Sequence, residues 1–211
     1  NCFFCGSRNI WSRQVRFRTP AHVVDEIKGL QAQGIRLFYF VDDNFGVNKG
    51  YLTDLCQALI KYCPGIKWNC EFHVNLVEDE VISLMKKAGC VGVEYGFESG
   101  SQRVLDLMNK KQKIEESLRA AELTRKARLR FQANIITGYP GETAEDFRET
   151  LKFIKKIKPN MIGFNIFMPL PGTPSNDKLK LEVQKLPKWE DVGDQEASQV
   201  NYADMPAAMF E

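Results

Sequence analysis

The chain has 211 residues, of which 44% are hydrophobic and 27% are charged, a composition typical of one globular domain with a sizeable core. Its formal net charge is +2 and its basic residues are spread along the sequence, so we expect no nucleic-acid partner, and pairs such as Lys110 and Lys111 are expected on solvated helix surfaces. No apolar run is long enough for a membrane span and no secretory leader is recognisable, which favours a cytoplasmic protein without a membrane segment.

Short runs rich in β-branched and aromatic residues alternate with amphipathic stretches. The runs predict buried strands over 35–41, 67–74, 91–97, 131–137 and 161–168. Apolar residues at helical spacing predict helices over 21–33, 52–62, 80–88, 114–127 and 144–157. Thr19 and Pro20 are typical of a helix start, and Gly89 is typical of a helix end. In the last helix we expect Phe147, Leu151 and Ile154 to face inward.

The alternation of strands and helices decides the fold class. A period of roughly 30 residues implies right-handed crossovers and a parallel sheet, either closed like a barrel or open and doubly wound. Ligands of such sheets bind at the carboxyl ends of the strands, and polar or glycine-rich residues follow each predicted strand. The pattern fades near Lys178, so we predict a core domain at residues 1–177 and an incomplete C-terminal extension at 178–211.

Six cysteines in a chain of this length do not make a disulfide scaffold, but two of them are closely spaced. Cys2 and Cys5 are separated by two residues, so one tight turn can present both sulfurs to the same metal centre. From spacing alone, an iron–sulfur cluster, a structural zinc half-site and a redox pair all remain open. The other four cysteines are expected to be small buried hydrophobic residues: Cys56, Cys63, Cys70 and Cys90.

Charged and polar residues lie where the predicted strands end. Asp42 and Asp43 follow the first strand, and they are suited either to a ligand ammonium group or to capping the next helix. Glu98 follows the third strand, and Glu94 lies an even number of residues earlier, so the two share a face of a regular strand. Glu94 is equally well interpreted as a satisfied carboxylate inside a barrel.

The chain has only two histidines. His22 falls in the first turn of a helix and is expected at the surface. His73 falls at the end of the second predicted strand, where it would face the mouth of a barrel if Asn75 does. Together with Asp42 and Asp43, His73 would supply the ligands of a zinc-dependent TIM-barrel hydrolase, although a lone histidine is more often structural.

Over about residues 1–180 these motifs together resemble the radical SAM superfamily. The first eight residues are similar to the end of its C-x3-C-x2-C motif, with Phe4 as the aromatic residue before the last cysteine. This resemblance places the first cysteine, and the strand before it, upstream of Asn1. Later segments resemble the family's Gly-Gly-Glu-type motif, its fourth-strand and fifth-strand signatures and its sixth strand with a Pro-Gly-Thr-Pro loop: residues 39–45, 93–101, 135–143 and 164–174.

The resemblance implies a parallel partial TIM barrel of the (β/α)6 type that lacks its first strand. It implies that Cys2 and Cys5 ligate a 4Fe–4S cluster. It also implies contacts to S-adenosyl-L-methionine (SAM) from these residues: Asp42, Asp43, Asn44, Glu98, Ser99, Gly138 and Pro169. The implied activity is reductive cleavage of SAM to methionine and a 5′-deoxyadenosyl radical that abstracts hydrogen from a small-molecule substrate, with electrons from a reductant such as flavodoxin or ferredoxin.

The order of the motifs is most similar to the branch of the superfamily with an N-terminal cobalamin-binding domain, which includes methyltransferases and the oxygen-independent Mg-protoporphyrin ester cyclase. We therefore expect cobalamin to act through a domain upstream of this chain. Three alternatives remain open from the sequence. They are a radical SAM enzyme without cobalamin, for example one like the methylthiotransferases; a SAM-binding module without catalysis; and the zinc hydrolase.

Overall fold

The computed structural model describes residues 2–11, 14–182 and 202–206. Five parallel strands form one sheet, in which each strand pairs with the next along the chain. The strands are β1 (Leu37–Phe40), β2 (Lys67–Glu71), β3 (Cys90–Glu98), β4 (Arg130–Thr137) and β5 (Met161–Ile166). The sheet is open, and it confirms the predicted parallel partial barrel. Because all strands run the same way, the loops that follow them gather at one edge.

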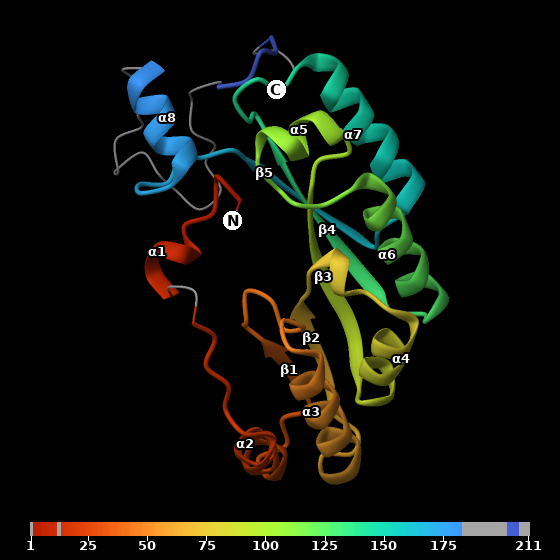
Figure 1. Cartoon of the computed structure of the whole chain (residues 1–211). Coiled ribbons are helices and arrows are strands. Elements are labelled where there is room, and N and C mark those ends of the chain that lie inside the picture. The colour runs from red at the N-terminus through yellow and green to blue at the C-terminus, as the bar shows by residue number, and fades with distance from the viewer. Residues whose placement is uncertain (1, 12–13, 183–201, 207–211) are drawn as a thin grey trace.

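The predicted helices are all present, with boundaries shifted by a few residues. They are α2 (Pro20–Ala32), α3 (Lys49–Tyr62), α4 (Asp79–Lys87), α6 (Ile114–Lys126) and α7 (Ala144–Ile157). Four short elements were not predicted: α1 (Ser7–Trp11), the 3-10 turn η1 (Val74–Leu76), α5 (Gln102–Leu107) and α8 (Pro174–Glu182). Figure 1 shows α4, α6 and α7 along one side of the sheet, while the N-terminal segment runs along the other.

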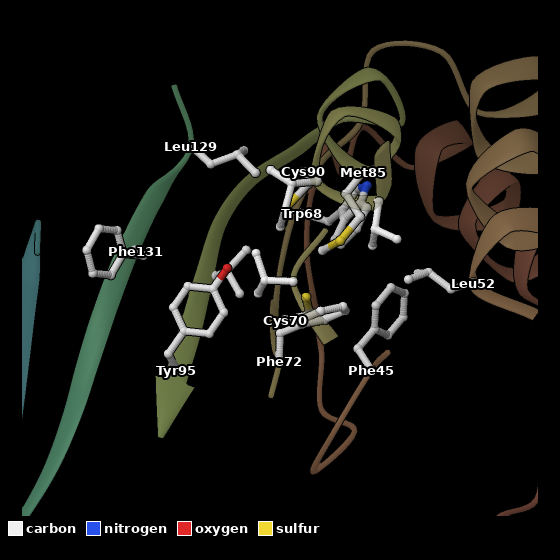
Figure 2. Close-up of a cluster of buried hydrophobic side chains, with 14 of the residues drawn as sticks. Phe45, Leu52, Trp68, Cys70, Phe72, Met85, Cys90, Tyr95, Leu129 and Phe131 are labelled. Carbon is white, nitrogen blue, oxygen red and sulfur yellow. The ribbon is translucent and has the colours of Figure 1, made fainter. Parts of the chain in front are cut away.

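The main hydrophobic core lies between the sheet and the helices on its outer face. Strand residues alternate, so that Trp68, Tyr95, Phe97 and Phe131 point toward the helices and are almost fully buried. Figure 2 shows part of this core, in which Cys70 and Cys90 lie near Trp68 and Met85. The four cysteines outside the close pair are all buried, as expected.

The inner face of the sheet is polar instead. Gly92 and Gly163 lie on it, and a neighbouring strand's amide covers each of them: an added Cβ would lie 2.6 Å from Asn69 Oδ1 at Gly92 and 2.6 Å from Asn134 Oδ1 at Gly163. Glycine is needed at these two positions because the covering side chain occupies the space of a Cβ atom. The inner face therefore keeps polar groups close to the strands.

Some sequence-based expectations were wrong. Leu151 is exposed, because the buried face of α7 runs through Phe153, Ile154 and Ile157. Strand β2 ends at Glu71, so His73 lies outside the strand and the argument from alternating faces does not apply to it. Lys110 is buried rather than solvated.

The predicted domain boundary at residue 177 falls inside α8. In the part of the extension that the structure describes, Tyr202 packs against Phe167, and the Asp204 N–H donates to the Glu142 carbonyl at 2.8 Å. The other predicted extension residues, 183–201 and 207–211, lie outside the described residues. Across the described helices, none combines the length and the apolar character needed to cross a bilayer.

Replacing Trp68 by Phe should destabilise the fold by about 2 kcal/mol. Trp68 is fully buried, and its Nε1–H donates to the Ala88 carbonyl at 2.8 Å, so the change leaves a small void and a carbonyl without its donor. Urea unfolding measures the effect. The same change at Trp11, which is 60% exposed, serves as the control and should stay within about 0.5 kcal/mol of the parent protein. Equal effects at the two positions would contradict the prediction.

Candidate cofactor site

The cysteine pair lies in one tight turn at the edge where the strands end. The Cys5 N–H points back to the Cys2 carbonyl at 3.4 Å, and both thiols are free and half-buried. Burial raises the pKa of Cys2, and the nearby Lys110 ammonium partly opposes that increase. Because metal ligation requires the thiolate, a bound metal would favour the deprotonated form that burial disfavours.

Backbone and side-chain contacts hold this turn against distant parts of the chain. The Phe3 N–H donates to the Met108 carbonyl at 2.9 Å, and the Ser175 N–H donates to the Phe3 carbonyl at 3.1 Å. Farther along, Asn9 Nδ2 donates to the Gly172 carbonyl at 2.8 Å. The segment that carries the cysteines is thus fixed between the end of α5 and the start of α8.

A buried ion pair lies near the cysteine turn. Lys110 Nζ and Glu98 Oε1 are 2.6 Å apart, and both side chains are about nine-tenths buried. Glu98 ends β3 with a φ of 63°, and its carboxylate folds over Gly96, where an added Cβ would lie 2.4 Å from Glu98 Oε1. Lys110 also lowers the pKa of Cys2, which places this ammonium within electrostatic reach of the predicted cluster ligand.

The residues after β1 line a cavity next to the cysteine turn. Its volume is about 1190 Å³, and its walls include Cys5, Asp42, Asp43 and Asn44. Asp42 and Asp43 are exposed, whereas Asn44 is half-buried. The Asn44 Oδ1 atom is itself buried and has no hydrogen-bond partner within the described structure. A buried acceptor of this kind is costly unless a donor meets it, so this part of the site is suited to a ligand with N–H or O–H groups.

The serine in the loop after β3 forms hydrogen bonds with other residues of the protein. Ser99 is fully buried, its hydroxyl lies 3.0 Å from that of Thr150, and it accepts the Ser101 N–H at 3.1 Å. These bonds fasten the loop to α7. A contact between Ser99 and SAM stays a prediction.

The loop after β4 is organised around a buried carboxylate. Gly138 has a φ of 83°, and its N–H donates to Glu142 Oε2 at 2.6 Å. Burial raises the pKa of Glu142 to about 7, against the lowering effect of the hydrogen bonds from this loop. In the following loop, the buried Pro169 accepts the Asn176 Nδ2–H at 2.9 Å. Side-chain hydrogen bonds therefore hold the backbone at Gly138 and Pro169 at the strand ends.

Carboxylates gather on the inner face below the mouth of the barrel. Glu71 and Glu94 are register partners on β2 and β3, and burial, with the charges of Glu94, Asp43 and Glu98, raises the pKa of Glu71. The Glu98 carboxylate lies over Gly96, which is two residues after Glu94 on β3, in agreement with the expectation that Glu94 and Glu98 lie on one face. The Tyr39 hydroxyl is hydrogen-bonded to Glu94, and Tyr39 and Cys5 line the same cavity.

The structure places His73 outside strand β2, unlike the sequence-based expectation. Its Nδ1 accepts the Asn75 N–H at 3.2 Å and so caps η1. Burial and the Lys110 charge lower the pKa of His73 to about 4, which keeps the ring neutral near pH 7. His22, by contrast, is exposed, as expected.

The donor set fits a thiolate-bound cluster better than a zinc site of carboxylates and histidine. Across the residues that the structure describes, no three His, Cys, Asp or Glu side chains come together in a way that could hold a metal ion. Asp42, Asp43 and His73 therefore do not form the predicted zinc site. Cys2 and Cys5 place two soft thiol groups in one turn, and their ligation of a cluster stays a prediction.

The fold and the site together define an open parallel α/β barrel with a cysteine turn at the carboxyl ends of its strands. The Radical SAM superfamily pattern matches residues 1–154, and the chain belongs to this superfamily. Membership contradicts the zinc hydrolase hypothesis.

Several known proteins are similar to the chain. An uncharacterized methyltransferase of Pyrococcus horikoshii is 32% identical over 174 residues, which cover 82% of this chain and 38% of that protein. The anaerobic magnesium-protoporphyrin IX monomethyl ester cyclase of Rubrivivax gelatinosus is 32% identical over 193 residues, which cover 89% of this chain and 35% of the cyclase. The chain thus spans little more than a third of these relatives.

A solved structure shares the fold. The radical SAM methyltransferase TsrM from Kitasatospora setae, with cobalamin and a 4Fe–4S cluster bound, aligns with a TM-score of 0.78 and 21% identity. The alignment covers 86% of this chain and 37% of TsrM. It supports the partial-barrel architecture.

Replacing Glu142 by Gln should change how stability depends on pH. Because the pKa of Glu142 is near 7 in the folded protein and near 4.5 in the unfolded chain, the folded state keeps a proton that the unfolded state releases between these values. The free energy of unfolding should therefore fall as the pH rises from about 4.5 to about 7, by about 3 kcal/mol. E142Q should lack this fall, as measured by urea unfolding across the range.

The exposed Glu145 on α7 provides the control, because E145Q should keep the slope of the parent protein. If E142Q and the parent protein showed the same slope, Glu142 would not be the titrating group.

Proposed function

We propose that the complete protein of which this chain is part binds a 4Fe–4S cluster and reductively cleaves SAM, with the resulting 5′-deoxyadenosyl radical acting on a small-molecule substrate. We further propose that it is a cobalamin-dependent methyltransferase or cyclase, with cobalamin held by a domain upstream of this chain. Electrons would come from a reductant such as flavodoxin or ferredoxin.

One arrangement carries this proposal. The cysteine turn, the Glu98–Lys110 pair and the cavity lined by Asp42, Asp43 and Asn44 all lie at the carboxyl ends of the strands. Cysteine thiols beside an ammonium group, and a cavity with two exposed carboxylates and the buried acceptor Asn44 Oδ1, suit a cluster with a zwitterionic ligand next to it. Membership of the radical SAM superfamily supports the same function.

Different residues of this chain would bind different groups of SAM. The carboxylates of Asp42 and Asp43 and the unpartnered Asn44 Oδ1 would accept hydrogen bonds from the methionine ammonium. Glu98 would accept from ribose hydroxyls, which are donors, while Lys110 beside it would attract the methionine carboxylate.

The remaining predicted contacts would come from the backbone. At Gly138 the missing Cβ lets the chain approach the adenine, and the Pro169 segment would close the same side. When bound, the reduced cluster would supply the one electron that cleaves the carbon–sulfur bond of SAM. The chain's own part is to hold the two cofactors against each other and to exclude water from them.

The cobalamin part of the proposal rests on the relatives. TsrM is described with cobalamin bound, and the matched relatives include a methyltransferase and a cyclase. Their similarity over more than four-fifths of this chain supports the same branch for the whole protein.

Replacing Cys5 by Ala in the full-length protein should abolish the cluster. The measurement is anaerobic reconstitution followed by iron and sulfide counting, the absorbance near 400 nm, and 5′-deoxyadenosine formed from SAM with dithionite. Cys63→Ala is the matched control, because Cys63 is a buried cysteine whose thiol contacts the Val24 carbonyl in the main core. C5A should lose all three signals and C63A should keep them. An unchanged spectrum in C5A would remove Cys5 from the ligands.

Replacing Glu98 by Gln should weaken SAM binding while the cluster stays. Gln keeps an acceptor near Lys110 but gives up the charge, so the loss should be about 1–3 kcal/mol. Equilibrium dialysis with SAM measures it on the reconstituted protein, and Glu115→Gln, at an exposed position at the start of α6, is the control. Unchanged affinity in E98Q would contradict a contact between Glu98 and SAM.

A further inference from the structure

The backbone of Phe3, between the two cysteines, is held from both sides. Its N–H donates to the Met108 carbonyl at the end of α5, and its carbonyl accepts the Ser175 N–H at the start of α8. We call these two contacts the Phe3 clamp. Figure 1 shows the N-terminal segment between α5 and α8, which agrees with the two hydrogen bonds. Helices far apart in the sequence therefore set the shape of the cysteine turn.

Tyr139 connects the end of α5 to the start of α8, the two places that hold Phe3. Its hydroxyl donates to the Leu107 carbonyl at 3.5 Å and lies 2.7 Å from the Ser175 hydroxyl. Each of these hydroxyls can donate one hydrogen bond and accept others, so either can be the donor of the shorter bond. Tyr139 and Ser175 are each 5% exposed, so water does not compete well for these bonds.

The surroundings of Tyr139 place it between the two cofactor regions. It directly follows Gly138, the predicted SAM contact, and its ring packs edge-to-face on Phe167 at 4.8 Å. Phe4 of the cysteine turn packs against the same small core. Cys2 is close enough for its charge to raise the pKa of the Tyr139 phenol.

We propose that Tyr139 is a positioning residue for the cluster, acting through the Phe3 clamp to fix the turn that carries Cys2 and Cys5. This inference rests on the proposed function, in which the turn ligates the cluster. Removing the Tyr139 hydroxyl removes the hydrogen bonds that connect α5 to α8. The two backbone hydrogen bonds of Phe3 then open more often, and the sulfur atoms of Cys2 and Cys5 are held less firmly in position. Tyr139 itself need not touch the cluster.

The test replaces Tyr139 by Phe in the full-length protein. On the cluster-free protein, hydrogen–deuterium exchange should show the Phe3 amide exchanging about tenfold faster than in the parent protein, the effect expected for losing one buried hydrogen bond. On the reconstituted protein, iron release to a chelator should be faster by a similar factor, and the EPR spectrum of the reduced cluster should change. Neither readout requires substrate.

Tyr95→Phe is the matched control. Tyr95 is also fully buried, and its hydroxyl is 2.7 Å from that of Thr124, but it lies in the main core. Y95F should lower the unfolding midpoint about as much as Y139F does, yet leave Phe3 exchange, iron release and the EPR spectrum unchanged. A general loss of stability would instead affect both variants alike, which would overturn the proposal.

A second variant tests the shared bond. Ser175→Ala removes the bond shared with Tyr139 and keeps the one to Leu107, so it should reproduce part of the effect of Y139F, and the double variant should match Y139F. Phe3 exchange in Y139F equal to that of the parent protein would also overturn the proposal. If the parent protein bound no cluster, the proposed function would fail, while the exchange comparison would still decide whether Tyr139 holds the clamp.

Discussion

The mouth of this barrel depends on keeping a buried carboxylate and a buried ammonium together. Glu98 and Lys110 come from β3 and from the loop after α5, and they meet above Gly96. Taking two charges out of water is expensive, and removal of one partner leaves the other uncompensated. The glycine, the positive φ of Glu98 and the loop that brings Lys110 are therefore constrained together. This constraint fixes the charge pattern of the mouth independently of any cofactor.

The two faces of the sheet serve different purposes. Closed barrels of this type usually fill their interior with layers of branched apolar side chains. Here the apolar residues of β3 and β4, such as Phe97 and Phe131, face the helices, while amides, carboxylates and glycines face inward. An inner face built this way does not close into a dry core. The space that remains is suited to polar ligands, and the outer core alone has to provide most of the folding free energy.

The sequence was sufficient for the features that depend on local patterns. Strand runs, helix periodicity and the cap at Thr19 follow from short-range rules, and the structure has them. The sequence did not predict features that depend on how distant segments meet in the folded chain. Lys110 follows a helix too short to show periodicity, and its burial depends on a positive φ at Glu98 and on the missing Cβ of Gly96. The expectation for Leu151 failed because helical spacing defines a stripe but not which edge of it the sheet covers.

The candidate site rests on a core of its own. Val104, Met108, Tyr139, Phe167 and Leu179 form a small cluster, separate from the main core, and Phe4 packs against it. Its members come from α5 and the residue after it, from the loops after β4 and β5, and from α8, and the two loops also carry the predicted SAM contacts Gly138 and Pro169. A small core with few members opens at lower free energy cost than the sheet and its helices. The fold can therefore keep the strands rigid while the turn that carries the cysteines and the loop at Gly138 adjust together, because both are fixed to the same few side chains.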